Sequence, residues 1–112
     1  MSFYTMISTE MKEKKQLVMA LKEMRKRGEI TEFERNVKTD SMKIDRSGDE
    51  FTLNLSKEGN YNVGGDNRLV ERFSNRLKQF YALESIKENL PLDFEVAEES
   101  ETEGEMRLIL KG

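Results

Sequence analysis

The sequence predicts an α+β fold, a two-layer sandwich with two helices packed on one face of an antiparallel sheet, in the order β-α-β-β-β-α-β-β. Three observations favour this fold. Two segments carry apolar residues at helical spacing, other apolar residues alternate with polar ones as in strands, and glycine-containing turns separate the strand segments. Because 112 residues is a common size for one domain, residues 1–112 are expected to form a single domain.

The first strand is expected near the amino terminus, where residues 3–11 alternate with a period of two and include several β-formers. From about Glu13 the period becomes helical. The apolar face of this helix contains Leu17, Val18, Leu21 and Met24. Gly28 follows a basic run and is expected to end the helix.

Short strands should form a meander after the first helix. Three segments with strand character and one further strand are predicted, over residues 30–37, 42–46, 51–56 and 61–63. The turns RSGD and SKEGN contain glycine among polar residues, as hairpin loops do. Met42 and Ile44 share one face, as do Phe51, Leu53 and Leu55, so the sheet should be covered on one side only.

The second helix is expected to follow the turn GGD and to end near Asn89. Asp66 is predicted to cap its start by accepting a hydrogen bond from a free backbone N–H. Its apolar arc contains Leu69, Val70, Phe73, Leu77, Phe80, Tyr81 and Leu83. Pro91, the only proline, follows the helix because proline cannot continue it.

Two last strands are predicted over residues 93–98 and 106–111, joined by the acidic loop EESETEGE. In the final strand Leu108 and Leu110 alternate with Ile109, so this strand is expected to be central or buried on both faces. The acidic loop lacks the ligand alternation and central glycine of a calcium loop, and we expect its carboxylates to be solvated.

The composition removes several classes of chemistry. The absence of cysteine and histidine excludes thiolate catalysis, imidazole general bases and Cys/His zinc sites. Acid pairs such as Asp49 and Glu50 fall in predicted turns, where carboxylates are simply solvated. We therefore predict no catalytic, cofactor-binding or metal-binding residues and no cofactor. Without a signal peptide or a membrane-length apolar run, a cytoplasmic protein with no membrane contact is expected.

Glu84 is the candidate perturbed carboxylate, because it falls within the apolar arc of the second helix. It could be a buried catalytic acid, which would need a partner such as Arg76 or a tyrosine hydroxyl. On a helical wheel, however, Lys87 lies at nearly the same angle as Glu84, whereas Ile86 lies at the opposite edge of the apolar arc. We therefore expect Glu84 to emerge past the sheet edge beside Lys87, as a weak ion pair.

The first helix ends in a basic cluster that gives the candidate partner-binding residues, Lys22, Arg25, Lys26 and Arg27. Such a cluster could hold phosphate, RNA or an acidic protein, or it could only offset the helix dipole as solvated surface. Residues 1–46 carry a net charge of +3 and residues 91–112 a net charge of −5. This asymmetry favours a charged protein partner or a head-to-tail homo-oligomer, whereas a pI of 5.2 is unfavourable for nucleic-acid binding.

Short motifs along the chain resemble one family of small proteins. They are the frame MS.YT...T, the helix residues Gln79, Tyr81, Ala82 and Ile86, and DFEVAEES followed by EGEMRLIL. The chain resembles the domain-of-unknown-function family twelve fifty-seven, which includes the conserved hypothetical chloroplast reading frame Ycf-thirty-five. The resemblance implies no catalytic residues and a gene neighbourhood near MoxR-type AAA+ ATPases. The chain departs from the family at Phe3, where histidine is usual, and at NVGGDN, where tryptophans are common.

Three hypotheses for function remain. The favoured one is a non-catalytic interaction or adaptor protein, accessory to a MoxR-type AAA+ ATPase as the resemblance implies. The second is a nucleic-acid-binding module that uses the basic first helix with Tyr4 or Tyr61 exposed. The third is an enzyme that uses carboxylates alone. Met6 and Met19 lie away from the apolar faces and are candidates for an exposed patch or a dimer contact.

Overall fold

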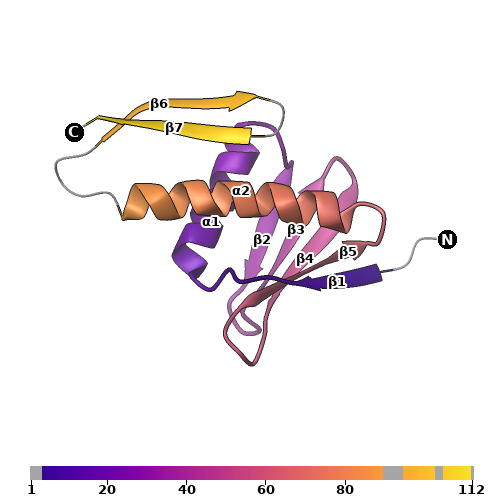
Figure 1. Cartoon of the computed structure of the whole chain (residues 1–112). Coiled ribbons are helices and arrows are strands. Elements are labelled where there is room, and N and C mark those ends of the chain that lie inside the picture. Colours follow the sequence, from indigo (N-terminus) through magenta and orange to yellow (C-terminus); the bar gives the residue numbers. More distant parts are fainter. Residues whose placement is uncertain (1–3, 90–94, 103–104, 112) are drawn as a thin grey trace.

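The structure, a computed structural model, describes residues 4–89, 95–102 and 105–111. Its elements are β1 (Tyr4–Ser8), α1 (Lys14–Lys26), β2 (Glu32–Asn36), β3 (Ser41–Arg46), β4 (Asp49–Leu55), β5 (Tyr61–Asp66), α2 (Val70–Glu88), β6 (Glu95–Thr102) and β7 (Glu105–Lys111) (Figure 1). This is the predicted α+β fold, with helices and strands in the predicted order. The further strand expected at residue 61 is a full strand, so four strands lie between the helices where the predicted order counted three.

Strands β1 to β5 form one antiparallel sheet in the order β1-β5-β4-β3-β2. Strands β2 to β5 follow one another as the predicted meander, and β1 pairs with the free side of β5. In the RSGD turn, Ser47 and Gly48 have φ angles of 51° and 94°. A two-residue hairpin turn of type I′ requires positive φ at both central positions, so this turn matches the twist of β3 and β4.

Both helices lie against one face of this sheet (Figure 1). Alternate strand residues face them and are buried, namely Met42, Ile44, Phe51, Leu53, Tyr61 and Val63. These residues join Leu17, Leu21 and Leu77 of the helices in one core, where the rings of Phe51 and Phe73 stack with centroids 4.2 Å apart. The intervening Lys43 is exposed, as is Met6 of β1. The prediction of a sheet covered on one side is confirmed.

The last two strands form a separate two-stranded sheet, β6 with β7. The prediction of a central final strand is therefore wrong. Every inner strand of the five-stranded sheet already has two neighbours, and β7 pairs with the strand that directly precedes it. Much of the stretch expected to be an acidic loop belongs to β6, since the pairing continues to Thr102 and Glu105. Pro91, expected after α2, lies outside the described residues.

The GGD segment is part of strand β5 and not a turn, which corrects the prediction. A Cβ atom added at Gly64 would overlap the Tyr4 hydroxyl on the open face of the sheet. A Cβ atom at Gly65 would lie 2.5 Å from the Phe51 ring on the core face. Both glycines are therefore explained by close approach of neighbouring rings and not by a turn.

The amino terminus of α2 also differs from the prediction. The helix begins at Val70 after Leu69, and no side chain caps it. The Asp66 side chain instead accepts a hydrogen bond of 2.8 Å from the backbone N–H of Arg68. Asp66 thus stabilises the turn between β5 and α2, because the helix starts too far along the chain for it to serve as the cap.

Neither helix, over the ranges described, combines the length and the hydropathy that crossing a membrane requires.

Candidate functional site

The predicted basic cluster lies at the exposed end of α1, where all four of its residues are accessible. Arg27 forms an ion pair of 2.9 Å with Glu23, and its guanidinium lies 5.2 Å from the centre of the Phe80 ring. Arg25 lies 5.1 Å from the ring of Phe33. The two arginines are therefore held against the protein by cation–π contacts, whereas Lys22 and Lys26 only add charge at the surface.

The charges around this helix end also act on Glu23. The hydrogen bond from Arg27 lowers the pKa of the Glu23 carboxyl, and the positive charges of Arg27, Lys26 and Lys87 lower it further. Partial burial opposes this shift without cancelling it. The end of α1 is therefore a locally positive environment even where an acidic residue is present.

The end of α1 directs the chain toward α2. Gly28 has a φ of 77°, and its N–H donates to the carbonyl of Arg25 at 3.1 Å. The N–H of Glu29 donates to the carbonyl of Met24 at 2.8 Å, which completes a Schellman motif. Gly28 thus ends the helix as predicted, and this tight ending brings Glu29 beside the middle of α2.

Glu29 pairs there with Arg76 of α2. The guanidinium donates two hydrogen bonds to the carboxylate, from Nε to Oε1 and from Nη2 to Oε2, the second 2.5 Å long. Its Nη1 donates to Oε1 of Gln79 at 3.1 Å, and its carbon lies 4.9 Å from the centre of the Phe80 ring. Arg76 is therefore fixed by a bidentate pair, an amide and an aromatic ring.

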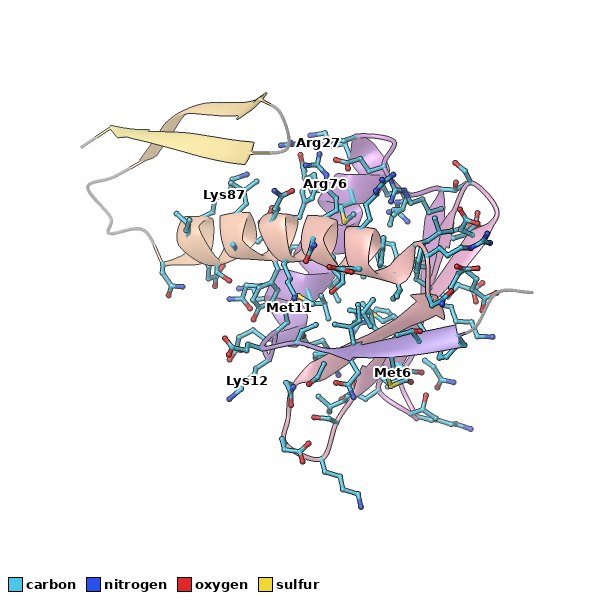
Figure 2. The ribbon with its side chains drawn as sticks, turned by 45° about the vertical axis from the view of Figure 1, so that its right-hand side comes forward. Met6, Met11, Lys12, Arg27, Arg76 and Lys87 are labelled. Atoms are coloured by element: carbon cyan, nitrogen blue, oxygen red, sulfur yellow. The ribbon has the colours of Figure 1, made fainter. Side chains whose placement is uncertain are left out.

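Arg27 and Arg76 come from different helices and contact the same ring, that of Phe80. Figure 2 shows their side chains next to each other at one end of the molecule. This contact joins the cluster of α1 to a second set of arginines on and beside α2. Together they form what we call the basic surface: Lys22, Arg25, Lys26, Arg27, Arg46, Arg68, Arg72 and Arg76.

The second set of arginines surrounds a cleft of about 550 Å³, the arginine cleft. Arg72 and Arg76 are four residues apart and lie on the same side of α2, Arg68 lies in the turn before this helix, and Arg46 comes from the end of β3. Glu29, Glu71, Asn75 and Gln79 complete the lining. Every lining residue carries a charge or an amide, so the cleft can bind a charged ligand.

The arginines of the cleft differ in how far their charge is already balanced. Arg76 pairs with Glu29, and Arg68 is 3.4 Å from a carboxylate oxygen of Asp66. Arg46 and Arg72 form no ion pair with any residue that the structure describes. Two guanidinium groups in this cleft are therefore available to a ligand.

The sequence interpretation missed the arginine cleft. The four-residue spacing of the α2 arginines is visible in the sequence and could have indicated a basic helix side. Arg46 could not have been added to it, because its position depends on how β3 lies beside the start of α2.

The prediction that Glu84 emerges past the sheet edge is wrong, because its side chain is buried at 6% exposure. The start of α1 covers the end of α2. The Tyr81 hydroxyl accepts hydrogen bonds from the N–H groups of Lys12 and Glu13 at 3.3 and 3.1 Å, and Lys15 pairs with Glu88 at 2.8 Å. Helix α2 is covered by both the sheet and a second helix. Its buried face can therefore extend further along the chain, as far as Glu84, than a sheet alone would allow.

Other candidate residues are distributed over the surface and the core. Met6 and Met19 are exposed by 48% and 39%, as expected, and they lie on different elements. Tyr4 is exposed, but only 1% of Tyr61 is exposed, so this residue cannot stack with a nucleic-acid base. Across the described residues, no three carboxylates gather as a metal site would require.

No family model, no curated protein and no solved structure matches the chain.

Proposed function

We propose that the protein is a non-catalytic interaction module that binds an acidic partner protein through the basic surface. The observation that carries the proposal is the shared contact of Arg27 and Arg76 with Phe80. It places two short charge clusters next to each other, and together these clusters can attract and orient an acidic partner.

The prevalence of arginine supports a protein partner. Arginine presents a planar fork that binds carboxylates bidentately, and it is enriched in protein interfaces, where lysine is depleted. Six of the eight residues that define the basic surface are arginines. Because Arg25, Arg27 and Arg76 are held by rings, part of the surface loses little side-chain freedom on binding.

Nucleic acid is the less favoured ligand. The chain has a net charge of −3, and Glu29 and Glu71 lie within the arginine cleft, where they oppose a continuous phosphate backbone. The burial of Tyr61 removes one of the two aromatic residues proposed for base stacking.

Two candidates for the acidic partner follow from the sequence. The family that the chain resembles is encoded near MoxR-type AAA+ ATPases, which makes such an ATPase the first candidate. The second is another copy of this chain, since residues 91–112 carry a net charge of −5.

A charge-reversal experiment tests the proposal. The wild-type protein is used to capture partners from a nuclease-treated extract of its host and is compared with the double variant Arg68→Glu/Arg72→Glu. The control is Lys43→Glu/Lys57→Glu, which makes the same change of charge at exposed residues outside the basic surface. We expect the wild type and the control to retain the same acidic protein, and the Arg68/Arg72 variant to bind the purified partner at least about tenfold more weakly.

Two results would overturn the proposal: recovery of the same proteins by the wild type and both variants, or recovery of nucleic acid alone when nuclease is omitted. A purified MoxR-type ATPase from the same host and sedimentation of the isolated chain then distinguish the two candidate partners.

A further inference from the structure

We infer that the arginine cleft is a binding site for a phosphate monoester group. This inference rests on the proposed function, because the cleft is part of the basic surface. The phosphate would belong either to the partner protein or to a free ligand.

The charge balance of the cleft fits a dianion. Arg76 is balanced by Glu29 and Arg68 by Asp66, which leaves the guanidinium groups of Arg46 and Arg72 without a carboxylate partner among the described residues, with Glu71 also in the lining. A phosphate monoester carries nearly two negative charges at neutral pH and has three strong acceptor oxygens. A single carboxylate would balance only one of these two guanidinium groups.

The geometry provides donors from more than one element. Arg46 approaches from the end of β3, whereas Arg72 and Asn75 belong to α2. Because Arg46 and Arg72 have no carboxylate partner among the described residues, binding a phosphate does not require an existing ion pair to break. Guanidinium forks bind phosphate oxygens bidentately, so these two side chains can hold one phosphate from two directions.

Other features of the cleft support phosphate binding. Arg76 is fixed by Glu29 and Gln79 and forms one wall of the cleft without needing to move. Glu71 limits the total charge and thereby disfavours a polyanion relative to a single phosphate group. A volume of about 550 Å³ is much larger than a bare phosphate, so there is room for the organic part of an ester.

The test follows the side-chain N–H signals of the arginines by NMR while inorganic phosphate is added to the isolated chain at constant ionic strength. We expect saturable shifts for Arg46 and Arg72 at pH 7.5, where a large share of inorganic phosphate is the dianion. Binding should be weaker at pH 5, where inorganic phosphate is almost entirely a monoanion. Arg72→Gln and Arg46→Gln should each weaken binding by about tenfold, and Arg72→Lys should also weaken it because lysine lacks the fork. Lys57→Gln removes one positive charge from an exposed turn and should leave binding unchanged.

Phenyl phosphate and a phosphoserine peptide then replace inorganic phosphate. Tighter binding of the peptide than of phenyl phosphate assigns the phosphate to a protein partner, and the reverse order assigns it to a small ligand.

Linear shifts without saturation, or equal effects of Arg72→Gln and Lys57→Gln, would overturn the phosphate site. If this occurs while Arg68→Glu/Arg72→Glu still abolishes partner capture, the proposed function stands and the further inference is wrong. Saturable phosphate binding with no loss of any protein partner in that variant would keep the site and refute the proposed function.

Discussion

Arg76 binds the carboxylate of Glu29 with two parallel hydrogen bonds, across 47 residues of sequence separation. Glu29 is the residue that the Schellman motif places just after α1, and Arg76 lies in the middle of α2. The pair therefore fastens one helix to the other, and it also defines one wall of the arginine cleft.

The first prediction concerns this pair. The two side chains are only 21% and 17% exposed, so Glu29→Gln leaves a largely desolvated guanidinium without its counter-charge. We expect the free energy of unfolding to fall by about 1–2 kcal/mol, measured by urea denaturation. Glu71→Gln, at an exposed position of the same cleft, should change it by less than about 0.5 kcal/mol. Equal effects of the two substitutions would show that the Glu29 pair does not hold the helices together.

The second prediction concerns the glycines of β5. Gly65→Ala places a methyl group against the buried Phe51 ring and should destabilise the protein by about 1–3 kcal/mol, because that ring is stacked on Phe73 and cannot move freely. Gly64→Ala meets Tyr4, which is 60% exposed and can turn away. Its cost should be smaller and should fall further in a Tyr4→Ala background, as a double-mutant cycle would show. A larger cost at Gly64 than at Gly65 would contradict this ranking.

The third prediction concerns alkaline pH. Burial raises the pKa of the Tyr61 hydroxyl, and the negative charge of Asp40 and a hydrogen bond to it raise it further. The folded protein therefore prefers neutral Tyr61, and this contribution to stability is complete below the ordinary value of 10.0 and decreases as pH rises above it.

The tyrosinate absorbance of the wild type and of Tyr61→Phe is measured as pH rises. The difference between the two curves should give the titration of the Tyr61 hydroxyl alone. Asp40→Asn should lower the pKa of Tyr61 while leaving it raised by burial, and Asp49→Asn, at an exposed position at the start of β4, should have no effect. A midpoint of Tyr61 ionisation at or below 10.0 in the folded protein would disprove the prediction.

The fourth prediction concerns acidic pH. Because Arg27 lowers the pKa of the Glu23 carboxyl, the ion pair contributes stability above the ordinary value of 4.5, and this contribution is lost as pH falls through the lowered pKa. NMR titration should show the pKa of Glu23 rising toward its ordinary value in Arg27→Gln. The loss of stability at neutral pH should be about 0.5 kcal/mol, since the pair lies near the surface. An unchanged Glu23 titration in this variant would exclude the pair as the cause of the shift.

The helices and the covered face of the sheet could be predicted because they depend on local periodicity. Leu17, Leu21, Phe73 and Leu77 are all fully buried, as their helical spacing indicated. The RSGD turn was equally visible, since its glycine permits the positive φ that a tight hairpin requires.

The errors have tertiary causes. The sequence predicted a turn at Gly64 and Gly65. Glycine is needed at these positions because the rings of Tyr4 and Phe51, which belong to other strands, approach the backbone closely. Glu84 was expected where the helix leaves the sheet, but it is buried. The segment around the start of α1, about 70 residues earlier in the chain, contacts this end of α2 through Tyr81 and Glu88. The arginine cleft was missed for the same reason, because it is completed by Arg46 from a strand.

The strand order leaves β2 at one edge of the five-stranded sheet. Glu32, Glu34 and Arg35 of this strand are all exposed, so a foreign strand that paired with its free side would have to bring its own side chains beside these charges. Charged edge strands of this kind oppose edge-to-edge aggregation. Replacing the two glutamates with β-branched apolar residues would therefore remove a natural barrier to amyloid-like growth while leaving the core unchanged.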